Sequence, residues 1–417
     1  MYSVFKFGGA SIRDVHNIIN VGKILQSYSN DKLVIVFSAM GKVTNMLENL
    51  VEDYVNGNTD PFISLQKVKD FHYSILDQLF EKQDSIFDKV NNLFVEIEWI
   101  LEEKPTNEYS YIYDQIVSIG EFLSTKIMSN YLLNIGFNNL LLDARDLIKT
   151  DNSYGNGKVD WDLTTNCIKS NVKANHCITQ GFIGCTSENF TTTLGREGSD
   201  FSAAILAFCL DANQVVIWKD VPGMMNADPK YFDSPILLEK VSFDEAIELA
   251  YFGAKIIHPK TIQPLKKKKI PLYIKSFLNP HNEGSHISAE VMLFPEIPSF
   301  IIKKNQILIS ISDPSLSFIV ETHMSKIFAL LAKHNVSVNM MQNSAISFSV
   351  CVDNEKYKIP ALIDDLQADF AVYYNKNLNL YTVRSYTQES EKYLLKNKEV
   401  LLEQRSRNTL QLVVKDI

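Results

Sequence analysis

The stretch Lys6-Phe-Gly-Gly-Ala-Ser11 decides the fold class of this sequence, because it leaves one predicted element and enters another. Residues Tyr2 to Phe7 predict a strand, and the next fifteen or so show helical periodicity from an N-cap at Ser11 to Leu25. The run from Lys32 to Phe37 predicts a second, fully buried strand. A β-α-β opening of this kind indicates a parallel sheet.

The two glycines of this stretch permit anion binding. Gly8 and Gly9 allow backbone N–H groups to approach an anion closely, and Lys6 adds a positive charge. A tight turn beside a surface lysine is an equally good interpretation of these residues alone. The sequence has no G-x-x-x-x-G-K-[ST] motif, so any phosphate loop here is not of the Walker A kind.

Strands and helices continue to alternate up to about residue 280. Residues 42 to 135 are mostly helical in pattern, so we expect a helical layer over the sheet. The remaining predicted strands cover 140–142, 174–183, 214–218 and 272–276, and the predicted helices cover 113–133, 199–210, 243–256 and 260–268. This alternation favours an α/β fold with three layers, in which a mostly parallel sheet has helices on both faces.

A second, smaller region follows. Residues 281–299 are rich in proline and polar side chains, and we expect them to form a linker between a domain at 1–280 and a region at 300–417. That region has the α+β order β-α-β-β-α-β, with strands at 307–311, 336–340 and 347–352 and helices at 322–333 and 359–367. Strands at 378–384 and 409–414 enclose a short helix and a middle strand near Val400, as a shortened repeat.

Composition excludes several classes of protein. The 417 residues carry a net charge of -8, which argues against nucleic acid as a partner. The apolar runs are far shorter than the roughly 20 residues of a membrane span, and the start resembles no secretion signal, so we expect a cytoplasmic protein without a membrane partner. The five cysteines form no C-x-x-C pair, which favours free thiols and no metal site.

Three further segments carry candidate chemistry. Arg196 lies between two glycines and could clamp a carboxylate, while Asp200 could orient a lysine or a metal ion. Helix capping would explain Ser199 and Asp200 equally well. The loop from Ile217 to Lys230 suits a nucleotide site or a plain connection. Lys255 could reach a phosphate or simply favour a helix C-terminus.

Taken together, the motifs resemble those of aspartokinases in the amino acid kinase superfamily. The matching segments are 6–11, 38–45, Gly120-Glu121, 193–196, 198–200 and 248–259. The resemblance implies transfer of the γ-phosphoryl group of ATP to the side-chain carboxylate of L-aspartate, with Mg²⁺ as cofactor. It also implies that region 300–417 is a ferredoxin-like regulatory pair of the ACT type, that lysine or threonine is an effector, and that the chain forms a homodimer or a higher homo-oligomer.

The resemblance also assigns residues. Lys6 would stabilise the transferring phosphoryl group, Asp200 would orient that lysine, and Gly8 and Gly9 would donate backbone hydrogen bonds. The residues implied to bind aspartate are Ser38, Thr44, Glu121, Arg196 and Ser199, with Glu121 receiving the amino group and Arg196 a carboxylate. The residues implied to contact ATP are Lys6, Lys219, Asp220, Met225, Lys230 and Lys255.

Several positions depart from the family pattern. Ala10 and Lys219 stand where threonine is usual, and Glu197 stands where glycine is usual. Met225 replaces a common aromatic residue, and Lys230 a common arginine. Two other activities therefore remain as alternatives: a related carboxylate kinase such as a glutamate kinase, or a catalytically weak amino-acid sensor.

Overall fold

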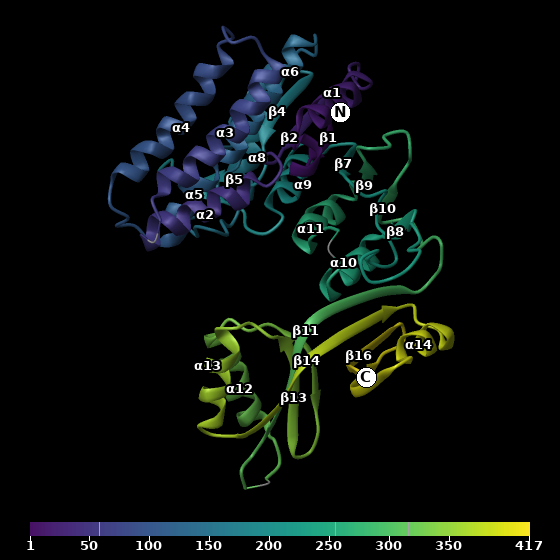
Figure 1. Ribbon diagram of the computed structural model, residues 1–417. Helices are drawn as coiled ribbons and strands as arrows, with labels where there is room; N and C mark the ends of the chain where they lie inside the picture. The colour runs from purple at the N-terminus through teal and green to yellow at the C-terminus, as the bar shows by residue number, and fades with distance from the viewer. Residues whose placement is uncertain (58, 255, 316) are drawn as a thin grey trace. The chain divides into compact units, whose positions relative to one another are not determined.

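The computed structural model describes residues 1–57, 59–254, 256–315 and 317–417. By its contacts the chain forms two compact units (Figure 1). The first contains Met1–Met224, Leu237–Ile247 and Ile256–Pro295, and the second contains Met225–Ile236, Glu248–Lys255 and Glu296–Ile417.

The first unit is built on an eight-stranded sheet with the strand order β3-β4-β2-β1-β7-β9-β10-β8. Its pairs are parallel except for β9 with β10. The strands are β1 (Ser3–Phe7), β2 (Leu33–Phe37), β3 (Leu140–Leu142), β4 (His176–Gln180), β7 (Gln214–Lys219), β8 (Lys240–Ser242), β9 (Leu272–Ser276) and β10 (Ser285–Ser288), and β5 (Ile183–Cys185) and β6 (Thr191–Thr193) form a separate hairpin. The predicted mostly parallel sheet is confirmed.

Helices cover both faces of this sheet (Figure 1). Phe5 and Phe7 of β1 share a buried cluster with Leu123 of α6 (Ile119–Asn134). Because side chains alternate along a strand, Lys6 faces the opposite layer, where α9 (Gly198–Leu210) packs on β1 and β7. The other helices of this unit are α1 (Val15–Gln26), α2 (Val43–Asn56), α3 (Pro61–Leu79), α4 (Ile86–Glu102), α5 (Tyr109–Val117), α7 (Ala144–Leu147), α8 (Trp161–Asn171) and α11 (Pro259–Lys268). The residues of α10 (Phe243–Phe252) up to Ile247 belong to this unit and the rest to the second.

The sequence-based boundaries were wrong in several places. Ser11 does not cap α1; it lies in a 3-10 helix, Gly9–Ile12, and the side chain of Asp14 caps α1 by accepting from Asn17 N at 2.9 Å. The predicted helix 113–133 is interrupted at Ser118 between α5 and α6, and the predicted strand 174–183 is divided into β4 and β5. The predicted linker contains β10, which pairs with β9 and β8.

The second unit contains a six-stranded antiparallel sheet in the order β12-β13-β11-β14-β16-β15. The elements are β11 (Ser299–Ser312), α12 (Glu321–Lys333), β12 (Val338–Asn343), β13 (Ser347–Asp353), α13 (Lys358–Gln367), β14 (Ala371–Arg384), α14 (Gln388–Leu395), β15 (Lys398–Arg405) and β16 (Thr409–Asp416). The predicted order β-α-β-β-α-β is confirmed. β11 is longer than expected because its first half, 299–303, pairs with 380–384 of the shortened repeat.

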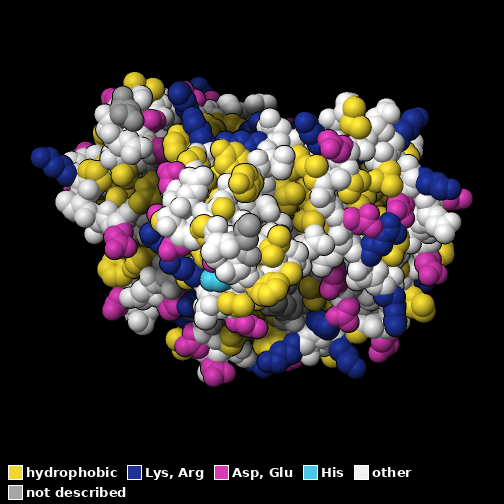
Figure 2. All heavy atoms as spheres, turned by 90° about the horizontal axis from the view of Figure 1, so that it is seen from below, with side chains coloured by type: hydrophobic (Ala, Val, Ile, Leu, Met, Phe, Trp, Pro, Cys, Tyr) yellow, Lys and Arg dark blue, Asp and Glu magenta, His cyan; other side chains and the backbone are white. Residues whose placement is uncertain are grey.

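Charged side chains of both signs are interspersed with hydrophobic ones on the face that Figure 2 shows. The five cysteines are free thiols, and four of them are buried. In the described part of the chain, no helix is at once long enough and apolar enough to cross a membrane.

Candidate active site

The centre of the candidate site is an ion pair between β1 and the first turn of α9. Lys6 Nζ lies 2.6 Å from Asp200 Oδ1, and both side chains are buried. Lys219, at the end of β7, places its Nζ 3.4 Å from the other oxygen of the same carboxylate. Burial alone would raise the pKa of Asp200, but Lys6 and Lys219 together hold it below its ordinary value. Asp200 is therefore an anion placed between two cations.

The glycine loop after β1 lies directly beside this pair. A Cβ added to Gly8 would stand 3.3 Å from Lys6 Nζ, and one added to Gly9 would stand 2.7 Å from the carbonyl oxygen of Ala39. The second distance is too short for any side chain, so the loop needs glycine at residue 9. The Gly41 N–H donates to the Gly9 carbonyl oxygen at 3.0 Å, which joins this loop to the loop that follows β2.

Glu121, in the first turn of α6, is a buried acid with an unused acceptor. Its Oε1 accepts a hydrogen bond from the Ala39 N–H at 3.2 Å, and its Oε2 has no partner among the described residues. Burial raises the pKa of Glu121 to about 8, although the Ala39 N–H and the positive charge of Lys6 act in the opposite direction. A ligand that supplies a cationic donor would satisfy the free oxygen.

The other residues predicted to bind aspartate lie on three segments. Ser38 directly follows β2, and its N–H donates to the Phe7 carbonyl oxygen at 3.1 Å. Thr44 is half-buried in the first turn of α2. Ser199 is buried in the first turn of α9 against Gly181, where an added Cβ would stand 2.5 Å from Ser199 Cβ. Arg196 is exposed in the loop between β6 and α9.

Two residues that anchor this loop were missed by the sequence reasoning. The buried carboxylate of Asp114 accepts from the Thr193 N–H at 2.9 Å, the Thr193 hydroxyl at 2.6 Å and the Gly155 N–H at 2.9 Å. Lys260 Nζ donates to the Leu194 carbonyl oxygen at 3.2 Å, and burial lowers the pKa of this lysine. In the sequence, the one sign that Asp114 has a structural role was its place as an acid among the apolar positions of a predicted helix.

The residues predicted to contact ATP lie on several segments of the chain. Lys219 Nζ donates to the Ile256 carbonyl oxygen as well as pairing with Asp200. Asp220 is exposed immediately after β7. Met225 and Lys230 belong to the second compact unit, and Lys255 lies outside the described residues. The contacts of these five residues and of Lys6 with ATP stay a prediction.

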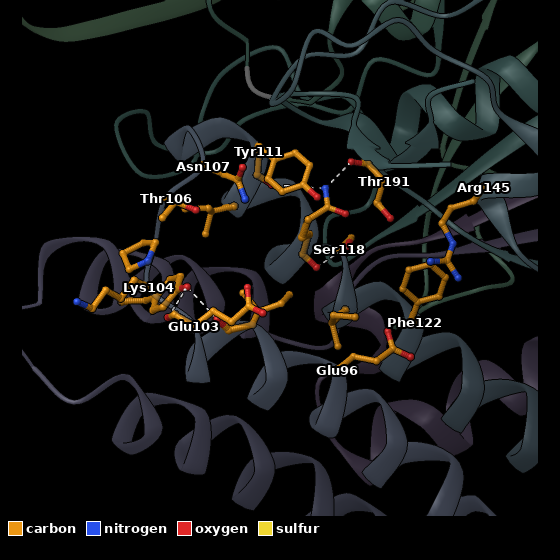
Figure 3. Close-up of a pocket in the computed structure, with 16 residues that line it drawn as sticks. Glu96, Glu103, Lys104, Thr106, Asn107, Tyr111, Ser118, Phe122, Arg145 and Thr191 are labelled. Atoms are coloured by element: carbon orange, nitrogen blue, oxygen red, sulfur yellow. Dashed lines mark hydrogen bonds between the residues drawn. The ribbon is translucent and has the colours of Figure 1, made fainter. Parts of the chain in front are cut away.

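A separate cavity of about 320 Å³ lies among the helices of the first unit (Figure 3). Phe122 of α6 lines it, and the Arg145 guanidinium lies 4.5 Å from the centre of the Phe122 ring. Gln115 Nε2, also in its lining, donates to the Thr191 carbonyl oxygen at 2.9 Å. Neither Glu121 nor Lys6 lines this cavity, so it is distinct from the candidate site.

Comparison with known proteins agrees with this geometry. Residues 1–276 match the model of the amino acid kinase family. The lysine-sensitive aspartokinase 3 of Escherichia coli (strain K12) is 31% identical over 84% of this chain and 78% of its own length. The bifunctional aspartokinase/homoserine dehydrogenase of Buchnera aphidicola is 29% identical over 85% of this chain, which spans 45% of that relative.

A solved structure extends the similarity to nearly the whole chain. The crystal structure of E. coli aspartokinase III in complex with aspartate and ADP superposes with a TM-score of 0.85 at 26% identity, covering 99% of this chain and 96% of that one. Both the sequence and the fold of this protein thus match across the segments that build the Lys6–Asp200 site. The chain belongs to the amino acid kinase family, and within that family to the aspartokinases.

Proposed function

We propose that this protein transfers the γ-phosphoryl group of ATP to the side-chain carboxylate of L-aspartate and releases ADP and 4-phospho-L-aspartate. The bond from the γ-phosphorus to the β,γ-bridging oxygen breaks, and a bond from phosphorus to a carboxylate oxygen forms. The observation that carries the proposal is the buried Lys6–Asp200 pair beside the glycine loop. The E. coli relative was crystallised with aspartate and ADP, which supports the same pair of ligands here.

The reaction requires little acid–base chemistry from the protein. An aspartate side chain is already ionised at neutral pH, so it attacks phosphorus without a general base. Two anions must be aligned, and the charge on the phosphoryl oxygens must be neutralised. Lys6 supplies positive charge, Asp200 fixes its position, and the N–H groups of Gly8 and Gly9 donate hydrogen bonds to the phosphoryl oxygens.

Recognition of aspartate is assigned to the residues around Glu121. The free Oε2 of Glu121 accepts from the α-ammonium group of the substrate. Arg196 forms a bidentate pair with the α-carboxylate, because a planar guanidinium matches a carboxylate with two parallel hydrogen bonds. Ser38, Thr44 and Ser199 line the remaining pocket.

Mg²⁺ enters as part of the nucleotide substrate. Within the described ranges, no group of three or more His, Cys, Asp and Glu side chains is placed to hold a metal ion. Asp200, the acid at the transfer site, is committed to Lys6 and Lys219. This suits Mg²⁺, which is commonly bound through substrate phosphates and several waters with few protein ligands. The metal, when bound, neutralises charge on the β- and γ-phosphates.

The C-terminal unit is assigned a regulatory role. Its β-α-β-β-α-β order, followed by a shortened repeat, matches the tandem ACT-type organisation expected from the sequence. The E. coli relative is described as lysine-sensitive, which favours lysine over threonine as the effector. From the family resemblance we assign the active form to a homodimer or a higher homo-oligomer, and size-exclusion chromatography with light scattering measures this directly.

The test measures ADP release from Mg-ATP by the full chain with L-aspartate, with L-glutamate and with no acceptor. Hydroxylamine trapping confirms that the product is an acyl phosphate. The Lys6→Met variant is the negative control. Turnover that depends on aspartate supports the proposal, while turnover with glutamate in preference would assign a glutamate kinase. Binding of an amino acid without turnover would assign a sensor. Added lysine tests the regulatory role in the same assay.

A further inference from the structure

We propose that Lys219 is a second phosphoryl-site cation, which binds the phosphoryl group in transit together with Lys6. The inference rests on the proposed function and deepens it, because it moves Lys219 from a general contact with ATP to the transferring group itself. Threonine is usual at this position in the resembling family, so the assignment concerns a residue particular to this chain.

The strand register places the two lysines on the same side of the sheet. β1 and β7 are parallel neighbours, and Lys6 pairs with Ile217. Lys219 lies two residues beyond Ile217, and side chains two residues apart on a strand point to the same face. Both lysine side chains therefore emerge toward α9 at the carboxyl end of the sheet, where ligands of open α/β sheets bind.

The carboxylate of Asp200 holds both ammonium groups. One oxygen lies 2.6 Å from Lys6 Nζ and the other lies 3.4 Å from Lys219 Nζ. Lys219 Nζ also donates a hydrogen bond to the Ile256 carbonyl oxygen. An ammonium group has three N–H donors, so after these two acceptors Lys219 has one donor left for a ligand.

The local charge favours an anion. Two lysines against one aspartate leave the cluster with a net positive charge, and only 10% and 22% of the side-chain surfaces of Lys6 and Lys219 are exposed. Positive charge that is little solvated attracts an anion more strongly than the same charge in water. A threonine hydroxyl at residue 219 would offer a hydrogen bond but no charge. Lys219 thus adds a cation where negative charge spreads over the phosphoryl oxygens.

The experiment compares two substitutions of Lys219 with one matched control. Lys219→Met removes the charge and keeps most of the apolar stem, while Lys219→Arg keeps a charge. Lys275→Met is the control, because Lys275 lies on the neighbouring strand β9, paired with Trp218, and belongs to no part of the proposed site. Each variant is measured for kcat, for the affinity of ADP and of the non-hydrolysable analogue AMP-PNP, and for its thermal unfolding midpoint.

Lys219→Met should lower kcat on the order of a hundredfold, the loss typical of removing one group that stabilises transition-state charge. The affinity for AMP-PNP should fall by about tenfold or more, while the affinity for ADP should change by less than about twofold. The reason is that only AMP-PNP places a phosphoryl group at the γ position. Lys219→Arg should keep more affinity for AMP-PNP than Lys219→Met. Lys275→Met should resemble the unmodified protein in all three measurements.

Two results would overturn the inference. One is a Lys219→Met protein with an unchanged kcat. The other is an equal loss of ADP and AMP-PNP affinity, which would place Lys219 at another phosphate or in a purely structural role. If Lys219→Met unfolds, the affinities of Lys219→Arg for AMP-PNP and ADP decide the question. A loss for AMP-PNP alone supports the inference, and an equal loss for both nucleotides overturns it. A wild-type protein without turnover would count against the proposed function, while the selectivity for AMP-PNP over ADP would still test Lys219.

Discussion

The substitution Glu121→Gln should weaken aspartate binding while it stabilises the free protein. Glu121 is 2% exposed as a residue, and its Oε2 has no partner in the described structure. Glutamine keeps the shape and can still accept from Ala39, but it carries no charge for the substrate ammonium group. A lost hydrogen bond between charged groups costs about 1.5 to 3 kcal/mol, so aspartate affinity should fall about 10- to 100-fold.

The gain in stability follows from the pKa of Glu121, which burial raises from 4.5 to about 8. Between these two values the unfolded chain carries an ionised carboxylate while the folded protein keeps the proton. The stability that the protonated group provides is complete below pH 4.5 and is lost as the pH rises to 8. Each pH unit between these pKa values corresponds to about 1.36 kcal/mol in the free energy of unfolding. From pH 5 to pH 7 the wild type therefore loses about 3 kcal/mol of this free energy, and Glu121→Gln retains it.

Two assays measure these effects. Urea unfolding at pH 5 and pH 7 gives the change in the free energy of unfolding for both proteins. Calorimetric titration with aspartate at pH 7, in two buffers of different ionisation enthalpy, gives the number of protons released. The substrate ammonium group lowers the pKa of Glu121 on binding, so the wild type should release close to one proton per aspartate and Glu121→Gln should release none.

Glu48→Gln is the matched control for both assays. Glu48 is a partly exposed acid of α2 that accepts from the Tyr113 hydroxyl at 2.8 Å. Its substitution should leave proton release unchanged. The reasoning would be refuted by equal proton release in the wild type and Glu121→Gln, or by a stability difference that does not grow between pH 5 and pH 7.

Three other substitutions test the remaining parts of the structure. Arg196→Lys should raise the KM for aspartate about tenfold with a smaller change in kcat, since a point charge cannot replace a bidentate clamp; an unchanged KM would remove Arg196 from the substrate pocket. Asp114→Ala should lower the free energy of unfolding by about 3 kcal/mol or more in urea, because two N–H groups and the Thr193 hydroxyl lose their acceptor, and a loss under 1 kcal/mol would contradict the anchoring role. Burial lowers the pKa of His72 to about 4, so the folded protein loses the stability that the neutral ring provides as the pH falls from 6.5 to 4. His72→Phe cannot be protonated and should therefore avoid about 3 kcal/mol of this loss in the free energy of unfolding. An identical pH profile of the urea midpoint in the two proteins would disprove this.

The sequence by itself was sufficient for the fold class. Strands buried on both faces appear as short continuous apolar runs, and amphipathic helices have a period of 3.6 residues. Both patterns depend only on near neighbours in the chain. The glycine loop after β1 follows from the same local rules, because Gly8 and Gly9 directly end a strand. Lys6 and Asp200 could be paired in advance only through the family resemblance.

Boundaries were harder to predict, because the tertiary structure decides where a local pattern stops. Ser118 interrupts a continuous helical pattern between α5 and α6. Residues 285–288 look like a linker in sequence, yet β10 joins the sheet of the first unit between β9 and β8. β11 extends through both repeats of the second unit because each half pairs with a different part of β14.

Burial and charge placement came only from the tertiary structure. Glu121 meets the Ala39 N–H across 82 residues of sequence, and Asp114 meets Thr193 across 79. The second ion pair of Asp200 requires β1 and β7 to be neighbours in the sheet, although more than 200 residues separate Lys6 from Lys219. A local pattern can show that a residue is an acid or a lysine, but its pKa and its partners depend on the solvent and charges that packing removes or brings near.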